Sequence, residues 1–378
     1  MAVLTEEQNF IKEQASAWVT AKAPVSTFRA LRDSKTQQAF LPATWKAMVD
    51  MGWSGILVPE QHGGSDLGYL TCGLILEQLG RQLTASPLFS SSLVGASAIL
   101  LAGNAAQQEA LLPAIVNGSA IVTLALDESS QHKPEQIALQ AQPSGASFSL
   151  SGTKTLVAEG MSATHFVVAT RSSGQPGDAL GISLFLVAAN ADGIARTALP
   201  TIDSRDYARL SFNNVRVDST ALLGAQDDGM PVLEKILDRA RVGIAAEMLG
   251  TASQAFDMTL DYLKTREQFG KVIGSFQALG HRAAALYSLQ EQSRSCVEAA
   301  LQAVDAGANN VPELAALAKC QVGKFLFAMS NELIQIHGGI GMTDEFDAGL
   351  YLKRARVLEA SFGNRAYHRN RYATLMGF

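Results

Sequence analysis

Charged side chains are scarce in this sequence. Only 17% of the 378 residues are Asp, Glu, Lys or Arg, against roughly 25% in an average soluble domain. We therefore expect other subunits to cover much of the surface. Disorder is excluded, because 47% of the residues are hydrophobic and such a chain can bury enough apolar surface to fold.

Basic residues are not in excess either. The 30 Lys and Arg against 35 Asp and Glu give a formal net charge of −5. This balance disfavours nucleic-acid binding, since phosphate backbones attract clustered Lys and Arg. Long apolar runs are also missing, and none approaches the roughly 20 residues that span a bilayer. We therefore expect no transmembrane helix.

Cysteines are few as well. Cys72, Cys296 and Cys320 are too scattered for a disulfide framework or a zinc site, and their odd number favours a reducing compartment. The first residues lack the pattern of a signal or transit peptide. These features predict a cytoplasmic protein.

The first third of the sequence has helical patterns. Thr5, followed three residues later by Gln8, predicts a capping box at the start of a helix. A second apolar helix is predicted over residues 69–79, with Gly80 as its stop signal.

The middle of the sequence changes to strand patterns. Residues 137–141 and 148–151 alternate with period two, and residues 165–170 and 182–187 are short apolar runs. Glycines and prolines separate them. About seven to nine strands over residues 121–217 predict a small β-barrel or sandwich.

The last segment is helical again. A long helix is predicted over residues 230–264, with three more near 275–307, 312–337 and 346–360. The order helical, β, helical argues against a doubly wound nucleotide fold. We predict an α+β protein with a helical N-terminal domain (1–118), a middle β domain (119–228) and a C-terminal helical bundle (229–378).

Two stretches of the C-terminal segment carry a specific resemblance. Residues 262–277 read YLKTREQFGKVIGSFQ, and residues 335–343 read QIHGGIGMT. They resemble the R-x-x-F-G and Q-x-x-G-G-x-G elements of the acyl-CoA dehydrogenase family. Residues 4–8 and 52–60 are similar to its N-terminal helices, so the resemblance covers essentially the whole chain. It implies FAD as cofactor and an oligomer, with a tetramer built around the C-terminal helices.

The resemblance implies a set of residues for the adenosine and pyrophosphate arm of FAD, some of which reach the cofactor of a neighbouring subunit. An arginine fork suits a pyrophosphate, a phenylalanine gives an apolar face, and glycines let backbone amides approach a phosphate. The alternative is a solvated helix charge at the arginine and a core position at the phenylalanine. The residues are Arg266, Phe269, Gln277, Gln335, Gly338 and Gly339.

A D-x-x-R pattern precedes these motifs. By resemblance, Asp238 and Arg241 contact the acyl-CoA substrate. The alternative is an ordinary ion pair between helix positions i and i+3.

The catalytic base is missing from both positions that the resemblance implies. The family desaturates an acyl-CoA thioester between its α- and β-carbons, and a Glu removes the α-proton. Phe362 stands where most of the family has this Glu, and Ala240 stands where a minority has it. Neither side chain can accept a proton.

The elements that cover the flavin ring in the family are altered too. Residues 126–130 read LDESS in place of a T-E-P-x-x-G-S-D stretch. After Gly152-Thr153-Lys154, Leu156 replaces an aromatic residue and Ala158 replaces a hydroxyl-bearing one. The residues for the flavin ring are therefore changed, whereas those for the arm are kept.

One hypothesis explains this asymmetry. The chain is the non-base subunit of a paired α2β2 acyl-CoA dehydrogenase, and its partner supplies the flavin-ring contacts and the Glu. It resembles the second subunits of such pairs, which act on steroid side chains or dicarboxylic acyl-CoAs, in the Phe-Gly ending at residues 362–363 and in the Ser-Pro-Leu stretch 86–88. An electron-transfer flavoprotein is the implied electron acceptor.

Two other hypotheses remain open. A self-sufficient homotetramer would need a relocated base, for which the candidates are Glu247, Asp127 and Glu128. Glu247 lies six residues after Arg241, about 600° of helix rotation, so it points elsewhere. A flavin monooxygenase on the same fold, or a non-catalytic scaffold, would need no base.

Overall fold

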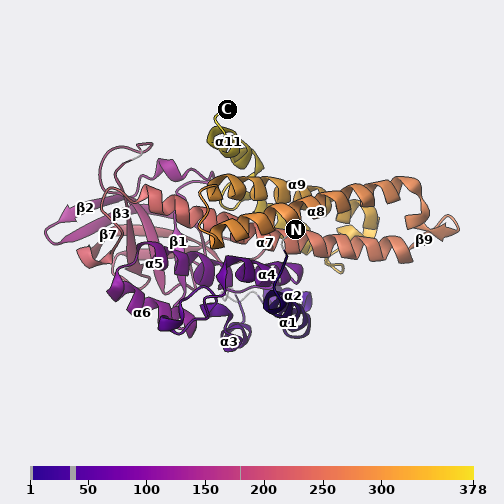
Figure 1. Ribbon diagram of the computed structural model, residues 1–378, viewed down its shortest axis with the longest axis horizontal. Helices are drawn as coiled ribbons and strands as arrows, with labels where there is room; N and C mark the ends of the chain where they lie inside the picture. The colour runs from indigo at the N-terminus through magenta and orange to yellow at the C-terminus, as the bar shows by residue number, and fades with distance from the viewer. Residues whose placement is uncertain (1–2, 35–39, 179) are drawn as a thin grey trace. The chain divides into compact units, whose positions relative to one another are not determined.

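The computed structural model describes residues 3–34, 40–178 and 180–378 (Figure 1). Helices, a sheet and further helices follow one another along the chain, which confirms the predicted order. The first helices are α1 (Glu6–Lys22), α2 (Val25–Ser34), α3 (Pro42–Asp50), α4 (Gly68–Arg81), a π-helical stretch (Leu88–Gly95), α5 (Ala96–Ala102) and α6 (Ala105–Val116). The main strands are β1 (Val122–Ala125), β2 (Gln140–Ser144), β3 (Ser147–Ala158), β4 (His165–Arg171), β5 (Ile182–Ala188), β6 (Ile194–Ala198), β7 (Tyr207–Asp218) and β8 (Leu222–Leu223). The last elements are α7 (Met230–Thr265), the hairpin β9 (Glu267–Gln268) and β10 (Lys271–Val272), α8 (Gln277–Asp305), α9 (Val311–His337), α10 (Ala348–Ala360) and α11 (Arg365–Leu375).

The chain divides into two compact units, which are described separately. The helical unit contains Met1–Asp33, Tyr69–Thr84 and Arg241–Phe378. The sheet unit contains Ser34–Gly68 and Ala85–Ala240. The three domains expected from the sequence, and the two boundaries between them, stay a prediction.

The sheet unit is built on one eight-stranded sheet with the order β6-β7-β3-β2-β4-β5-β8, and β1 pairs in parallel with β4. Its apolar core includes the rings of Phe148 and Phe185, whose centroids lie 4.9 Å apart. The long strands β3 and β7 pair antiparallel, with an irregularity between Lys154 and Val157. Leu156 lies within this irregularity with a φ of 53°, a left-handed backbone that costs an ordinary residue about 1–2 kcal/mol.

One predicted strand is misplaced. The strand expected over residues 137–141 begins only at Gln140. The backbone amides of Ala138 and Leu139 donate to the carboxylate of Glu128, at 3.0 Å and 2.9 Å. A side chain therefore occupies the donors that a strand would offer to its neighbour.

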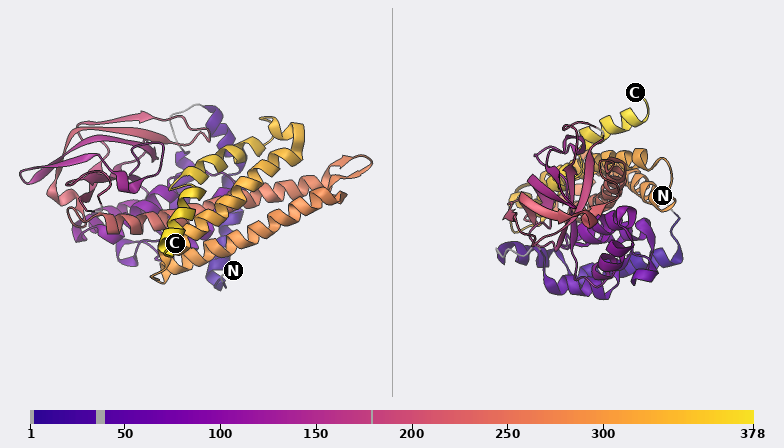
Figure 2. Two further views of the ribbon diagram at one scale, coloured as in Figure 1. Left: turned by 90° about the horizontal axis from the view of Figure 1, so that it is seen from above. Right: turned by 90° about the vertical axis from the view of Figure 1, so that its left-hand side faces the viewer.

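The helical unit begins with the predicted capping box. The hydroxyl of Thr5 accepts from the amide of Gln8, and the amide of Thr5 donates to the Gln8 side chain, both at 3.1 Å. Figure 2 shows α7 and α8 running alongside each other to the β9–β10 hairpin. The four helices expected after residue 230 are confirmed, and α11 is a further helix that the sequence did not predict.

Gly80 does not stop α4, as the sequence suggested, because the helix continues to Arg81. A Cβ on Gly80 would overlap the carbonyl oxygen of Glu247 on α7, and a Cβ on Gly250 would overlap the carbonyl oxygen of Glu77 on α4. These glycines allow two helix backbones to touch. Their function is close packing and not termination.

Candidate functional site

The two long sequence motifs meet in the helical unit. The ring of His337, in the second motif, stacks on Tyr262, in the first, with centroids 4.2 Å apart. Phe346 lies on the histidine as well, at 4.6 Å. The Nδ1–H of His337 donates to the carbonyl of Leu333 at 2.7 Å, since a carbonyl can only accept. Burial lowers the pKa of His337, so the ring is a neutral packing group.

The predicted FAD-arm side chains are all exposed. The guanidinium of Arg266 has no side-chain partner in the described part of the chain, and Gln277 and Gln335 are also open to solvent. Phe269 is 92% exposed on a left-handed backbone with φ 53°. A large ring this exposed gains nothing from the chain's own core, so the alternative of a core phenylalanine does not hold here.

The paired glycines of the second motif are open as well. Gly338 ends α9 with a φ of 61°. A Cβ at Gly338 or Gly339 would meet no atom within 4 Å, so packing within the chain does not require either glycine. The open backbone suits a phosphate that approaches its amides. These residues fit the adenosine and pyrophosphate arm of FAD.

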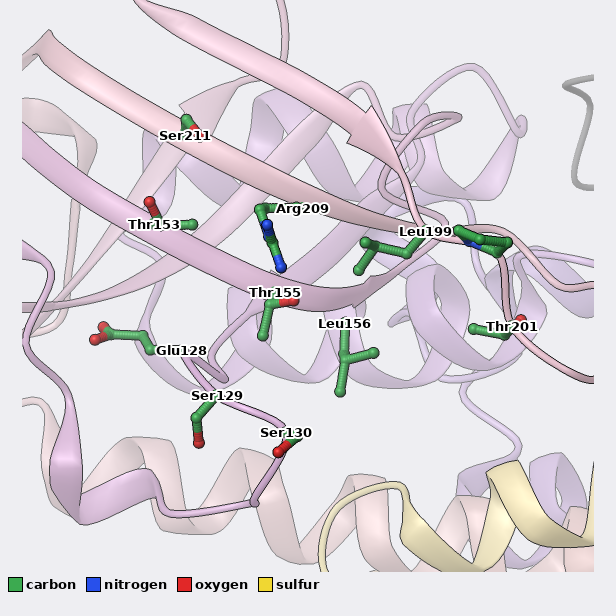
Figure 3. A pocket seen from close by; sticks show the side chains of 11 residues that line it. Glu128, Ser129, Ser130, Thr153, Thr155, Leu156, Leu199, Thr201, Arg209 and Ser211 are labelled. Carbon is green, nitrogen blue, oxygen red and sulfur yellow. The ribbon is translucent and has the colours of Figure 1, made fainter.

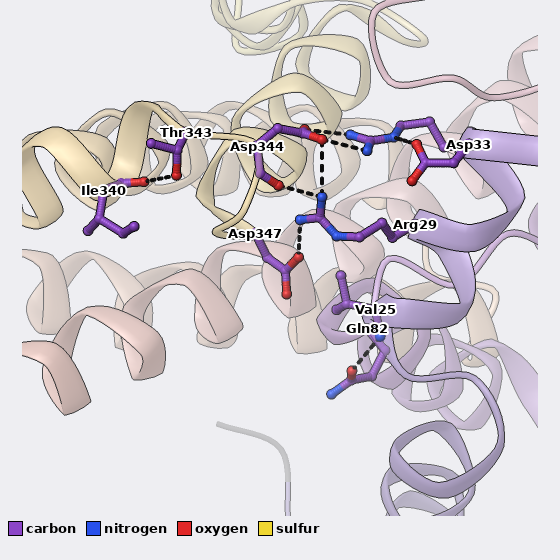
Figure 4. A network of polar contacts seen from close by, with 9 residues as sticks. Val25, Arg29, Asp33, Gln82, Ile340, Thr343, Asp344 and Asp347 are labelled. Atoms are coloured by element: carbon purple, nitrogen blue, oxygen red, sulfur yellow. Dashed lines mark hydrogen bonds and ion pairs between the residues drawn. The ribbon is translucent and has the colours of Figure 1, made fainter.

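The loop after the glycines is fixed to α2 by ion pairs (Figure 4). Arg32 holds the carboxylate of Asp344 with two bonds of 2.7 Å. Arg29 donates to the backbone oxygen of Asp344 at 2.5 Å and to Asp347 at 2.6 Å. The hydrogen bonds from Arg32 hold the pKa of Asp344 below its usual range. The same loop exposes Met342, at 76%.

The turn at the family's base position carries no carboxylate. Phe362 follows α10 with a φ of 55°. Its carbonyl accepts from the Nε2–H of His368 at 2.9 Å. Ala240, at the second base position, is completely buried.

Basic side chains are buried around this turn. Lys319, 2% exposed, donates to the carbonyls of Leu358 and Glu359 at the end of α10, at 2.9 and 3.2 Å. Burial lowers the pKa of Lys319 to about 7. Burial, with Lys319 and Arg241 nearby, lowers the pKa of His368 to about 2. The turn is therefore held by neutral or weakly basic donors.

The D-x-x-R residues are both buried. Arg241 is 0% exposed, and its guanidinium donates to the hydroxyl of Tyr367 at 3.1 Å. Asp238 is 3% exposed. In this conformation Arg241 contacts the segment after Phe362, and its contact with acyl-CoA stays a prediction.

Each relocated-base candidate already has a partner. Glu247 accepts from Arg354 at 2.6 Å and 3.0 Å. Asp127 contacts His132 at 3.1 Å. Both carboxylates are therefore engaged within the chain.

Glu128 is paired with Lys154, which is 0% exposed and lies 2.6 Å away. The same ammonium donates to the carbonyl of Leu126 at 2.9 Å. Burial lowers the pKa of Lys154, and Glu128 opposes this effect. Lys154 thus joins the two altered flavin-side stretches. The sequence alone gave it no role, although a lysine on the inward face of a strand needs an acidic partner.

A pocket of about 600 Å³ lies on the sheet unit beside these stretches (Figure 3). Its polar side chains include Arg209, to which no sequence motif drew attention. Leu156, 41% exposed, lies at its edge. An aliphatic side chain cannot stack on a flavin ring as an aromatic one does. The residues of these two stretches therefore do not fit a flavin ring, whereas the FAD-arm residues fit the phosphates.

Other classes of site find no support in the described residues. No group of His, Cys, Asp and Glu there could hold a metal ion. The cysteines are free thiols. Within the described ranges, no helix combines the length and hydropathy of a membrane span.

Comparison with known proteins places the chain in a family. The acyl-CoA dehydrogenase N-terminal domain matches residues 5–119, and the acyl-CoA dehydrogenase C-terminal domain matches residues 227–376. The acyl-CoA dehydrogenase FadE27 of Mycobacterium tuberculosis is 29% identical over 87% of this chain and 86% of its own length.

Two solved structures agree. A variant of the Tcur3481–Tcur3483 steroid acyl-CoA dehydrogenase has a TM-score of 0.89 and 30% identity, over 98% of both chains. The ChsE4–ChsE5 complex from Mycobacterium tuberculosis has a TM-score of 0.91 and 27% identity, over 100% of both. The chain belongs to the acyl-CoA dehydrogenase family, a flavoprotein family of oxidoreductases that act on CH–CH groups.

Proposed function

We propose that this chain is the non-base subunit of a heteromeric, FAD-dependent acyl-CoA dehydrogenase. The partner is a second acyl-CoA dehydrogenase chain that holds the flavin ring and carries the catalytic Glu. This chain completes the partner's FAD site with its exposed arm residues. Hydride acceptance is the chemistry that FAD supplies when bound.

The observation that carries the proposal is Phe362 at the family's base position. Its turn is fixed by the bond from His368 to the Phe362 carbonyl, and it offers no group that accepts a proton. The carboxylates that could replace the base are engaged by Arg354, His132 and Lys154.

The arm residues support a role across an interface. Phe269 and Met342 expose large apolar surfaces, at 92% and 76%, and Met342 lies in the same short helix as the open glycines. Exposed apolar side chains next to a polar site are typical of surfaces that another chain covers. The low content of charge agrees with this interpretation.

The relatives support the substrate class and the pairing. One of the solved relatives is a steroid acyl-CoA dehydrogenase, and the other is a complex of ChsE4 with ChsE5. We propose a bulky acyl-CoA, such as a steroid side-chain thioester, as substrate and an electron-transfer flavoprotein as acceptor. The cytoplasmic location stays a prediction.

Co-expression tests the proposal. The chain is purified alone and together with a second acyl-CoA dehydrogenase chain that carries the Glu. Flavin absorbance per chain, mass by light scattering and dye reduction with an acyl-CoA are measured on both. We expect a colourless, inactive chain alone and a yellow, active hetero-oligomer. A chain that is yellow and reduces the dye alone contradicts the proposal and favours the homotetramer with a relocated base.

A further inference from the structure

The loop of residues 343–347, here called the clamp loop, directly follows the short helix that contains the open glycines. That helix spans Gly338–Met342 and ends at Thr343. The amide and the hydroxyl of Thr343 both donate to the carbonyl of Ile340, at 3.1 and 2.8 Å. A movement of the clamp loop would therefore also move the last turn of the glycine helix.

Two arginines of α2 hold the clamp loop by its acidic residues. Arg32 donates to both carboxylate oxygens of Asp344 at 2.7 Å. Arg29 donates to the backbone oxygen of Asp344 at 2.5 Å and to the carboxylate of Asp347 at 2.6 Å, and Figure 4 shows it reaching from α2 to both. A guanidinium fork and a bond to the backbone define a position better than a single surface ion pair does.

An aromatic ring fixes the same loop on the helix before the glycines. Phe346 lies between the two aspartates in sequence, and its ring packs on His337 with centroids 4.6 Å apart. His337 directly precedes Gly338. The clamp loop thus connects the α2 arginines with the residue from which the glycine helix starts.

The glycines themselves have little packing to hold them. Both are exposed, and a Cβ at Gly338 or Gly339 would meet no atom within 4 Å. Backbone amides bind a phosphate well only when they already point in the right direction. Contacts that fix this backbone from a distance lower the cost of ordering it and so raise affinity without touching the ligand.

We propose that Arg29 and Arg32 are positioning residues for the glycine motif, and that through Asp344 and Asp347 they set how tightly the assembled enzyme holds the phosphates of FAD. This inference rests on the proposed function. It extends the cofactor site to α2, a helix that the FAD-arm motifs do not include.

A clamp that only stabilises the fold is the alternative. The Asp344 side chain is 65% exposed, and ion pairs at such positions contribute little to global stability. The two roles therefore differ in what they predict. Positioning requires a local effect on residues 338–347 and on FAD affinity, whereas a stabilising contact shifts global unfolding.

Hydrogen exchange of the chain alone, followed by mass spectrometry, tests the local effect. Arg29→Ala and Arg32→Ala are compared with the wild type, and Lys46→Ala, which breaks an exposed ion pair on α3, is the matched control. We expect faster exchange over residues 338–347 in the two α2 variants only, with thermal midpoints within about 2 °C of the wild type in all three. Unchanged exchange there, or faster exchange spread evenly over the helical unit, would overturn the proposal.

The dissociation constant of FAD, measured by flavin fluorescence on the assembled complex, tests the effect on the cofactor. Arg32→Ala and Asp344→Ala should each weaken FAD binding by about five- to tenfold, and the double variant should lose no more, because both changes break one interaction. Arg32→Lys keeps the charge without the fork and should restore part of the affinity. Additive losses in the double variant would overturn the proposal.

The failure of this inference can be told apart from the failure of the proposed function. A wild-type complex that binds no FAD contradicts the proposed function and this inference with it. A complex that loses FAD in Arg266→Ala but retains it fully in Arg32→Ala overturns the positioning role alone.

Discussion

His337 stacks on Tyr262 with 4.2 Å between ring centroids, and this contact joins the two motifs on which the FAD arm depends. Tyr262 lies near the end of α7, four residues before Arg266, and His337 directly precedes Gly338. The buried Nε2 of His337 has no hydrogen-bond partner among the described residues. The ring is therefore present for its shape and contacts more than for its polarity.

Replacing this ring should loosen both motifs. His337→Ala is expected to lower the free energy of unfolding by about 2–4 kcal/mol, as for other buried aromatic truncations. His337→Phe keeps the stack and should cost about 1 kcal/mol or less. Urea unfolding followed by circular dichroism measures both. Equal losses in the two variants would show that hydrogen bonding, and not stacking, is what the site needs.

Arg266→Ala should lower the FAD content of the assembled enzyme. The guanidinium is exposed and unpaired within the described residues, and a phosphate contact of this kind contributes about 1.5–3 kcal/mol, a tenfold or greater loss in affinity. Flavin absorbance after gel filtration measures it. Lys264→Ala, an exposed cation near the same helix end, is the matched control and should retain the flavin. Full occupancy in Arg266→Ala would remove this residue from the cofactor site.

Phe362→Glu should leave the FAD occupancy of the complex largely unchanged, because the turn lies apart from the arm motifs in sequence and is held through its backbone. The chain alone is expected to remain inactive in dye reduction, since the flavin-ring contacts are still missing. Phe362→Gln is the uncharged control. A Phe362→Glu chain that becomes active by itself would show that only the base was absent.

Lys319 should make stability depend on pH. Its pKa is lowered from 10.5 to about 7 in the folded chain, chiefly by burial. Between these values the unfolded chain binds a proton that the folded chain does not, so stability rises with pH from about 7 to 10.5 and is lost again as pH falls. In Lys319→Met this rise should be smaller than in the wild type, as measured by urea unfolding across that range. Parallel curves would mean that the lysine is charged when buried.

Gly250→Ala should be costly, because its Cβ would overlap the carbonyl oxygen of Glu77. Overpacking of this kind is expected to lower the unfolding free energy by about 2–3 kcal/mol. Gly280→Ala, on α8 with open space around its Cβ, should instead raise it by about 0.5–1 kcal/mol. Thermal unfolding of the two variants gives the comparison.

Local signals predicted the elements that depend on local chemistry. The capping box at Thr5 and the long apolar helices are confirmed because caps and periodic faces are properties of neighbouring residues. Gly80 was misjudged because a glycine that ends a helix and one that lets two helices touch look alike in sequence. Helix α11 was missed because only His368 is buried along it, so it has no apolar periodicity.

The sequence motifs predicted some residues of the site and missed others. The motifs indicated Arg266 and the open glycines, whose exposure agrees with a role outside the chain's own core. Lys154 and His337 were not singled out, because their roles depend on contacts across the fold. A buried lysine near Glu128 needs long-range pairing that no local pattern records.

The helical unit is assembled from three separate pieces of the chain, Met1–Asp33, Tyr69–Thr84 and Arg241–Phe378. During synthesis, α4 leaves the ribosome long before the α7 glycine that it packs against. At 5–20 residues per second, the wait until the last piece is complete is roughly 15–60 s. The sheet unit, which ends at Ala240, can fold first. Until then the early helices expose their apolar faces in the nascent chain, and we expect chaperones to bind them.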